Sequence, residues 1–164
     1  MPAADRVLHT LRFDAIGTAW QIDSGVLLTP RQTAEVHRLV EEFDRAYSRF
    51  RADSLVTRLA EDGGAIVFPD DLPPMIAVYD ELFDATAGAM TPLVGGALAQ
   101  LGYAAQYSLR PSGPPIGSPD WRRSVSVTGS TISAERPVLL DFGAAGKGYL
   151  VDLVADLLAE MGVA

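Results

Sequence analysis

The residues best suited to chemistry lie in one stretch near the end of the sequence, residues 138–152 (VLLDFGAAGKGYLVD). An apolar run typical of a buried strand ends there at Asp141, a Gly- and Ala-rich loop follows, and the spacing of a helix begins after it. Backbone N–H groups and the positive end of a helix dipole can bind an anion in such a loop. Lys147, the only lysine of the chain, adds a full positive charge. The stretch therefore indicates a site for a diphosphate.

Two common phosphate-binding motifs do not describe this loop. A P-loop would need Gly at the position of Asp141 and Ser or Thr at that of Gly148, and the Gly spacing of Rossmann proteins is also absent. The alternative interpretation is structural: a strand-to-helix turn in which Asp141 caps the loop and Lys147 is solvated. The residues alone leave both interpretations open.

Other side chains with catalytic potential are better explained by structural roles. His9 lies in a strand-like segment and His37 in a helical one, where a packed or surface imidazole is expected. Ser48 and Ser54 flank helices, where serine commonly caps the N-terminus. The chain has no Cys, and no triad of nucleophile, His and acid is visible. The sequence therefore assigns no catalytic residue.

The elements that must position these residues mix strands with helices. Alternating apolar residues predict a β-hairpin over residues 9–28, and Pro30 opens a helical periodicity that predicts a long helix over residues 30–50. The same reasoning predicts helices over residues 55–60, 73–87, 93–101 and 146–161, and strands over residues 65–68, 124–127, 131–133 and 138–141. The last helix should bury an apolar stripe made of Leu150, Val151, Val154, Leu157 and Leu158. This order of elements favours an α+β or α/β class with one interrupted sheet.

Composition narrows the class of protein. The chain has 164 residues, 13 basic against 21 acidic side chains, and a net charge of −8, which predicts a single globular domain over residues 1–164 and argues against nucleic acid as a partner. We expect a cytoplasmic protein, because neither a secretory signal nor a membrane-spanning apolar segment is visible. The last residues, 162–164, resemble a turn into another strand, so we expect the chain to be incomplete.

Five separated segments resemble, in the same order, the FAD:protein FMN transferase (ApbE) family. They are residues 16–18 (IGT), 48–54 (SRFRADS), 88–94 (GAMTPLV), 101–103 (LGY) and 141–152 (DFGAAGKGYLVD). The resemblance implies an α+β fold with a mixed or antiparallel sheet and packed helices, the T-fold-like architecture of ApbE proteins. It covers about the first half of the family domain. The family's later Gly-Gly-Asp strand, His segment and acidic metal-binding segment have no counterpart in this sequence.

The resemblance also implies roles for individual residues. Ile16 stands where the family usually has Met packing on the flavin, and Phe50 where it often has Tyr stacking on the aromatic system of FAD. The implied contacts with FAD are made by Ile16, Phe50, Ala89, Met90, Thr91, Asp141 and Lys147. The implied ligand of Mg²⁺ is the backbone carbonyl of Ala144, and one carbonyl cannot hold this ion without carboxylate partners. A structural alternative stays open for Phe50, which aromatic packing could place in the core.

The activity implied by the resemblance is Mg²⁺-dependent transfer of FMN from FAD to a Ser or Thr hydroxyl of a target protein. The expected partners are therefore FAD, which is the substrate, and that target protein. Since the chain matches only about half of the family domain, we expect it to be inactive by itself. Two alternatives stay open: an FAD-binding module without transferase activity, and an FAD pyrophosphatase in which water replaces the protein hydroxyl.

Overall fold

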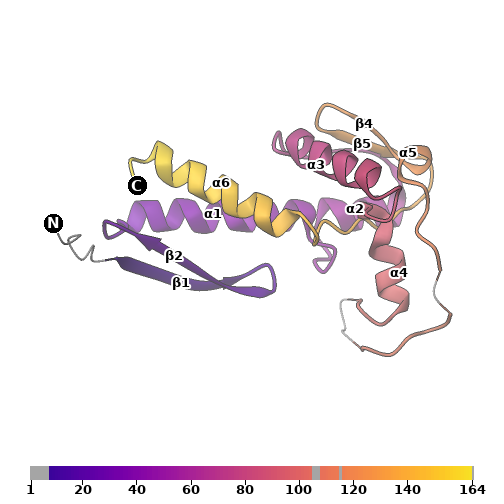
Figure 1. Ribbon diagram of the computed structural model, residues 1–164, viewed down its shortest axis with the longest axis horizontal. Helices are drawn as coiled ribbons and strands as arrows, with labels where there is room; N and C mark the ends of the chain where they lie inside the picture. Colours follow the sequence, from indigo (N-terminus) through magenta and orange to yellow (C-terminus); the bar gives the residue numbers. More distant parts are fainter. Residues whose placement is uncertain (1–7, 105–107, 115, 164) are drawn as a thin grey trace. The chain divides into compact units, whose positions relative to one another are not determined.

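The computed structural model of the chain describes residues 8–104, 108–114 and 116–163 (Figure 1). The chain divides into two compact units, Met1–Phe43 with Lys147–Ala164, and Asp44–Gly146. Helices α1 (Pro30–Tyr47) and α6 (Gly146–Glu160) each contribute residues to both units. The expectation of one domain over residues 1–164 stays a prediction.

The first unit begins with the β-hairpin that the alternating apolar pattern predicts. Strands β1 (His9–Ala15) and β2 (Thr18–Ser24) pair in antiparallel register, with Phe13 opposite Trp20. The two rings stack at 5.8 Å between centroids, and Phe13 also meets His37 of α1 edge to face at 4.8 Å. His37 is exposed, and its imidazole lies on the surface with this one ring contact, which agrees with the structural role that its helical position indicates.

Two helices complete the core of this unit. Helices α1 and α6 run antiparallel and side by side (Figure 1), and Gln32 near the start of α1 donates a hydrogen bond of 3.3 Å to the carbonyl of Met161 after the end of α6. Their buried stripes are Val36, Val40 and Phe43 on α1, and Leu150, Val154 and Leu158 on α6. The sequence predicts Val151 in this stripe, but Val151 is 51% exposed, because it lies one position outside the buried face.

The second unit contains a three-stranded antiparallel sheet in the order β3-β5-β4. Its strands are β3 (Gly64–Val67), β4 (Ser126–Thr128) and β5 (Thr131–Ala134), and its helices are α2 (Leu55–Asp62), α3 (Leu72–Ala85), α4 (Gly95–Gln100) and α5 (Trp121–Ser124). A short 3₁₀ helix, η1 (Pro92–Val94), precedes α4. Helices packed with antiparallel sheets confirm the α+β class.

Aromatic rings form the centre of the second unit. Tyr47 stacks on Phe68 with centroids 5.7 Å apart, and Phe142 meets both Tyr47 and Tyr79 edge to face at 5.5 and 5.6 Å. All four side chains are buried. This cluster connects the end of α1, the segment after β3, helix α3 and the segment before α6, so it fixes the loop that precedes α6.

One expected strand is absent, and several other elements have different limits. Residues 138–141 form no strand: the Asp141 N–H donates to the carbonyl of Pro92 at 2.7 Å, and a Cβ on Gly95 would lie 2.5 Å from the Leu139 oxygen. The segment thus runs against a helical turn, which offers no ladder of strand hydrogen bonds, and a buried apolar run does not reveal that difference. Helix α1 ends at Tyr47 instead of residue 50, and the start of the expected strand 124–127 is the end of α5. None of the helices in the described ranges has the length and apolar character needed to cross a bilayer.

Candidate functional site

A buried ion pair connects two of the segments that carry the family resemblance. Arg49, just after α1, pairs through its Nε with the Oδ2 atom of Asp141, and its Nη1 donates to the carbonyl of Tyr103. The side chains of Arg49 and Asp141 are only 7% and 12% exposed. The other carboxylate oxygen of Asp141 accepts the Gly143 N–H at 2.7 Å. Asp141 is thus a fixed anchor, held by a cation and by the loop that it precedes.

Phe50 is exposed, and its ring packs against the guanidinium of Arg49. The guanidinium carbon of Arg49 is 4.1 Å from the centre of the Phe50 ring, which is within cation–π distance. The Phe50 side chain is 41% exposed, so the interpretation of Phe50 as a core residue is wrong. An exposed aromatic ring that is fixed on a buried cation is suited to stacking on a planar ligand.

The segment with Ala89, Met90 and Thr91 is held next to Asp141 by backbone contacts. Thr91 is buried and caps η1, because its hydroxyl oxygen accepts the Leu93 N–H at 3.2 Å. The carbonyl of the following Pro92 accepts the Asp141 N–H. Ala89 is exposed and Met90 half-buried. Of these three residues, Ala89 and Met90 are accessible to a ligand, whereas Thr91 shapes the turn.

In residues 141–146, called here the 141–146 loop, several backbone N–H groups donate hydrogen bonds within the protein. Besides the Gly143 N–H, the Gly146 N–H donates to the Phe142 carbonyl at 2.7 Å and the Ala145 N–H donates to the Tyr79 hydroxyl at 3.3 Å. The expectation that this loop presents free N–H groups to an anion is therefore wrong for these three amides, because a donated hydrogen is no longer available.

The buried Tyr79 side chain contacts the 141–146 loop through its hydroxyl. Its side chain is 1% exposed, and burial raises the pKa of its hydroxyl to about 12, with the negative charge of Asp141 acting in the same direction. The hydroxyl binds the N–H of Ala145 on the buried side. Because a trans peptide bond points its N–H and C=O in opposite directions, the carbonyl of Ala144 is directed away from Tyr79. Ala144 itself is exposed.

Ile16 and Lys147 belong to the other unit and are described separately. Ile16 and Gly17 form the two-residue turn of the hairpin, with φ of 45° and 71°. Positive φ at both positions is typical of a type I′ turn, and it is unusual for a β-branched residue. Lys147 is exposed in the first turn of α6. The structure does not relate these two residues to Phe50 or Asp141.

The described residues do not form a complete magnesium site. No three His, Asp or Glu side chains converge anywhere in the described ranges. The carboxylate of Asp141 is engaged by Arg49 and Gly143, which leaves the exposed Ala144 as the one expected ligand. Since Mg²⁺ requires six oxygen ligands and usually one or two carboxylates, these residues do not fit the ion without further ligands.

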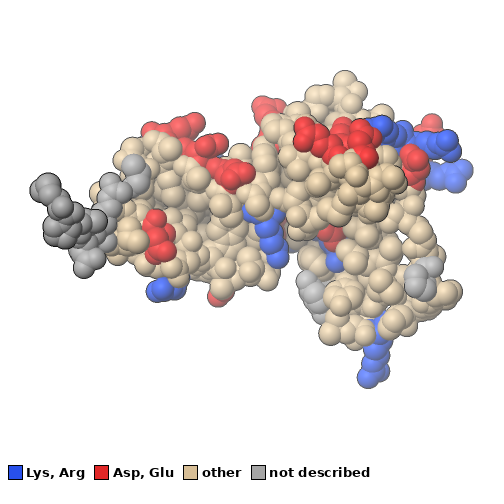
Figure 2. Space-filling model, viewed as in Figure 1, with Lys and Arg blue, Asp and Glu red and all other residues tan. Residues whose placement is uncertain are grey.

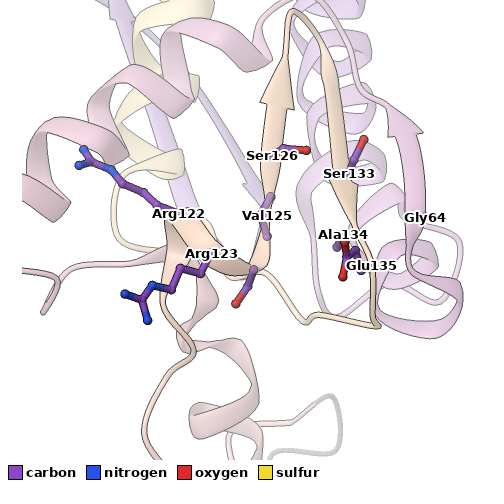
Figure 3. Close-up of a pocket in the computed structure, with 9 residues that line it drawn as sticks. Gly64, Arg122, Arg123, Val125, Ser126, Ser133, Ala134 and Glu135 are labelled. Carbon is purple, nitrogen blue, oxygen red and sulfur yellow. The ribbon is translucent and has the colours of Figure 1, made fainter.

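A separate groove in the second unit contains none of the expected site residues. It has a volume of 320 Å³ and is lined by Gly64, Arg122, Arg123, Ser124, Val125, Ser126, Ser133, Ala134 and Glu135. Arg122 and Arg123 extend from α5 to one side of the strands (Figure 3). On the face shown in Figure 2, acidic side chains gather in patches, and basic side chains lie partly at separate points and partly together at the upper right of the view. The groove is therefore not the location that the family resemblance indicates.

Sequence reasoning missed Arg49 and Tyr79. Arg49 lies within the matched segment 48–54, and an arginine directly before an aromatic residue is the signal that could have identified it. Tyr79 follows the periodicity of α3 and gives no such signal, because a buried helical tyrosine has the same spacing whatever its hydroxyl binds.

Comparisons with known proteins identify the family and the fold. The sequence model described as the ApbE family matches residues 16–164. A comparison with curated protein sequences found no match. Among solved structures, the fold is similar to the flavin transferase ApbE from Vibrio cholerae, with a TM-score of 0.78 and 22% identity over 96% of this chain and 55% of that one. It is also similar to the flavinyl transferase ApbE from Pseudomonas stutzeri, with a TM-score of 0.79 and 22% identity over 99% of this chain and 58% of that one.

A third similar structure is the ApbE protein from Thermotoga maritima, with a TM-score of 0.74 and 19% identity over 93% of this chain and 53% of that one. At these identities the likeness establishes the fold. The chain spans a little over half the length of each of these three proteins. With its family model matched over residues 16–164 and its fold shared with these structures, the chain belongs to the ApbE family.

Proposed function

We propose that this chain binds FAD and is part of a transferase that moves FMN from FAD to a Ser or Thr hydroxyl of a target protein. The observation that carries the proposal is the exposed Phe50 ring fixed on the buried pair of Arg49 and Asp141. Family membership and the similarity of the fold to flavin transferase structures support it. A cytoplasmic location stays a prediction from the sequence alone.

The proposed reaction is a phosphoryl transfer. The acceptor hydroxyl oxygen attacks the phosphorus on the FMN side of the FAD diphosphate, the bond to the bridging oxygen breaks, AMP leaves, and the hydroxyl proton passes to solvent or a base. Catalysis of such a step depends on positioning and on neutralising charge. The proposed roles are charge neutralisation by the exposed Lys147, aromatic contact by Phe50 and apolar contact by Ile16. Ala89 and Met90 are proposed to line the flavin, beside the turn that Thr91 caps.

We propose that Asp141 contacts FAD only with the part of its carboxylate that is not already bound. Its oxygens already bind Arg49 and the Gly143 N–H, so a contact with FAD would use the remaining lone pairs of a fixed carboxylate. Dependence on Mg²⁺ is also part of the proposal, with the Ala144 carbonyl as one ligand. The ion would reduce the negative charge of the diphosphate when bound, and its other ligands would come from outside the described residues.

One alternative function is supported by a specific observation. Since no cluster of His, Asp and Glu occurs in the described ranges, the chain is also compatible with FAD binding without transfer. FAD pyrophosphatase activity would use the same attack with water as the nucleophile. The product distinguishes the three functions: flavinylated protein, free FMN with AMP, or unchanged FAD.

The first experiment is FAD binding, measured by quenching of flavin fluorescence with and without Mg²⁺. We expect the wild-type chain to bind FAD, and Lys147→Ala to weaken binding about tenfold because a charge-assisted contact is lost. Arg58→Ala, which removes another exposed positive charge, is the matched control and should bind as the wild type does. A folded chain that does not quench FAD fluorescence would contradict the proposed function. Mass spectrometry of an acceptor peptide incubated with FAD then tests transfer.

A further inference from the structure

The environment of Arg49 is unusual for an arginine. Arginine side chains are seldom fully buried unless they are paired, and this one is 7% exposed. Three parts of its guanidinium have separate contacts: Nε binds Asp141, Nη1 binds the Tyr103 carbonyl, and the flat face lies over Phe50. Three segments that are far apart in the sequence thus meet at one planar group.

These contacts fix the direction of the guanidinium plane. The two hydrogen bonds lie in the plane of the fork, so their acceptors determine how the plane is oriented. Phe50 packs on the face of that plane at 4.1 Å while 41% of its side chain remains exposed. The contact of this ring with a fixed cation is therefore one constraint on its orientation.

We propose that Arg49 is a positioning residue that holds the Phe50 ring in the orientation on which the aromatic ring system of FAD stacks. This inference rests on the proposed function, and it assigns to Arg49 an effect on flavin affinity that is exerted through Phe50. Asp141 and the Tyr103 carbonyl then serve to orient Arg49. A lysine cannot replace Arg49 in this role, because an ammonium has no flat face and no fork.

A double-mutant cycle tests the inference in the 164-residue chain. The variants are Arg49→Lys, Phe50→Ala and the combination of both, and the measured quantity is the dissociation constant for FAD from fluorescence quenching. Arg49→Lys keeps a positive charge beside Asp141, so it avoids the unpaired buried carboxylate that an uncharged replacement would leave. We expect Phe50→Ala to weaken binding about tenfold and Arg49→Lys about threefold or more.

The decisive result is the combined variant. If Arg49 acts through the Phe50 ring, the combined variant binds FAD no more weakly than Phe50→Ala alone, because the ring that Arg49 would position is already gone. If the two effects multiply, or if Arg49→Lys binds as the wild type does, the inference is wrong. Effects that multiply are also the result expected from a purely structural role of Arg49.

Two controls separate this inference from the proposed function. Arg51→Lys changes a neighbouring arginine that pairs with Asp44 and Asp53, and it should leave FAD binding unchanged. Thermal unfolding of every variant identifies any change in binding that comes from loss of fold. If the wild-type chain itself does not bind FAD, the proposed function fails and the inference falls with it. If the wild type binds FAD and the cycle is multiplicative, only the inference fails.

Discussion

Replacing Tyr79 with Phe should destabilise the protein at neutral pH and stabilise it, relative to the wild type, in strong alkali. The substitution removes one oxygen from a fully buried ring and leaves its packing against Phe142 intact. At pH 7 the Ala145 N–H loses an acceptor at 3.3 Å, but Ala145 is half-exposed and water can replace that acceptor in part. We therefore expect the free energy of unfolding to fall by about 1 kcal/mol, the low end of the range for a lost hydrogen bond.

The alkaline effect has the opposite sign. Burial raises the pKa of Tyr79 from 10.0 to about 12, so between these values the unfolded chain loses a proton that the folded chain keeps. The stability linked to this proton is present in full below pH 10 and is lost as the pH rises toward 12, at about 1.4 kcal/mol per pH unit. Between pH 10 and pH 12 the free energy of unfolding of the wild type should thus fall by about 2 kcal/mol, and that of the Phe variant should not show this fall. The two curves of stability against pH should cross at about pH 11.

Urea unfolding followed by circular dichroism, from neutral pH to about pH 12, measures both effects. The matched control is Tyr103→Phe, which removes a hydroxyl from an exposed ring and should change the free energy of unfolding by less than about 0.5 kcal/mol at each pH. Curves for the wild type and Tyr79→Phe that stay parallel across the range would refute the reasoning, since they would show that the Tyr79 hydroxyl is not desolvated in the folded state.

Three further substitutions test other parts of the fold. Burial raises the pKa of Asp71, so the folded protein binds this proton more tightly than the unfolded chain does. The stability that comes from the protonated carboxyl is present in acid and is lost as the pH rises through the pKa of the folded state. Asp71→Asn keeps an acceptor for the Tyr47 hydroxyl and should raise the urea midpoint at pH 7 but not at pH 3. Ser54→Ala removes the buried N-cap of α2 and should cost about 1–2 kcal/mol in thermal unfolding, with an unchanged melting temperature as the contrary result. Gly95→Ala would place a Cβ 2.5 Å from the Leu139 oxygen and should destabilise by about 1–3 kcal/mol; a fully stable variant would show that this close approach relaxes freely.

The features that sequence predicted well are those encoded by neighbouring residues. The hairpin follows from the alternation that places Phe13 and Trp20 on one face, and α1 starts where Pro30 sets the backbone for a helix. The cap at Ser54 follows from the same kind of local rule, because its hydroxyl accepts the Thr57 N–H three residues later. Such rules need only a few consecutive residues to apply.

The features that sequence missed depend on residues far apart in the chain. Arg49 and Asp141 are 92 positions apart, and Tyr79 and Ala145 are 66 apart, so no periodicity reports either contact. The apolar run before Asp141 resembles a strand for the same reason. The sequence indicates that the run is buried, but it does not show the backbone partner that distinguishes a strand from a connecting segment. The site residues implied by family resemblance remain predictions that the binding experiments test.

The flavin contact proposed for Ile16 would compete with protein stability at the hairpin turn. A β-branched residue with a φ of 45° costs about 1–2 kcal/mol relative to a residue that accepts this conformation. Selection for thermal stability alone would therefore replace Ile16 with Gly or Asn, the residues that type I′ turns prefer. Selection for contact with a flavin would instead retain a large apolar side chain at the tip and accept the strained backbone beneath it. Under the proposed function, a substitution that stabilises this turn should weaken the affinity for FAD, and the strain at Ile16 would be the stability given up for that contact.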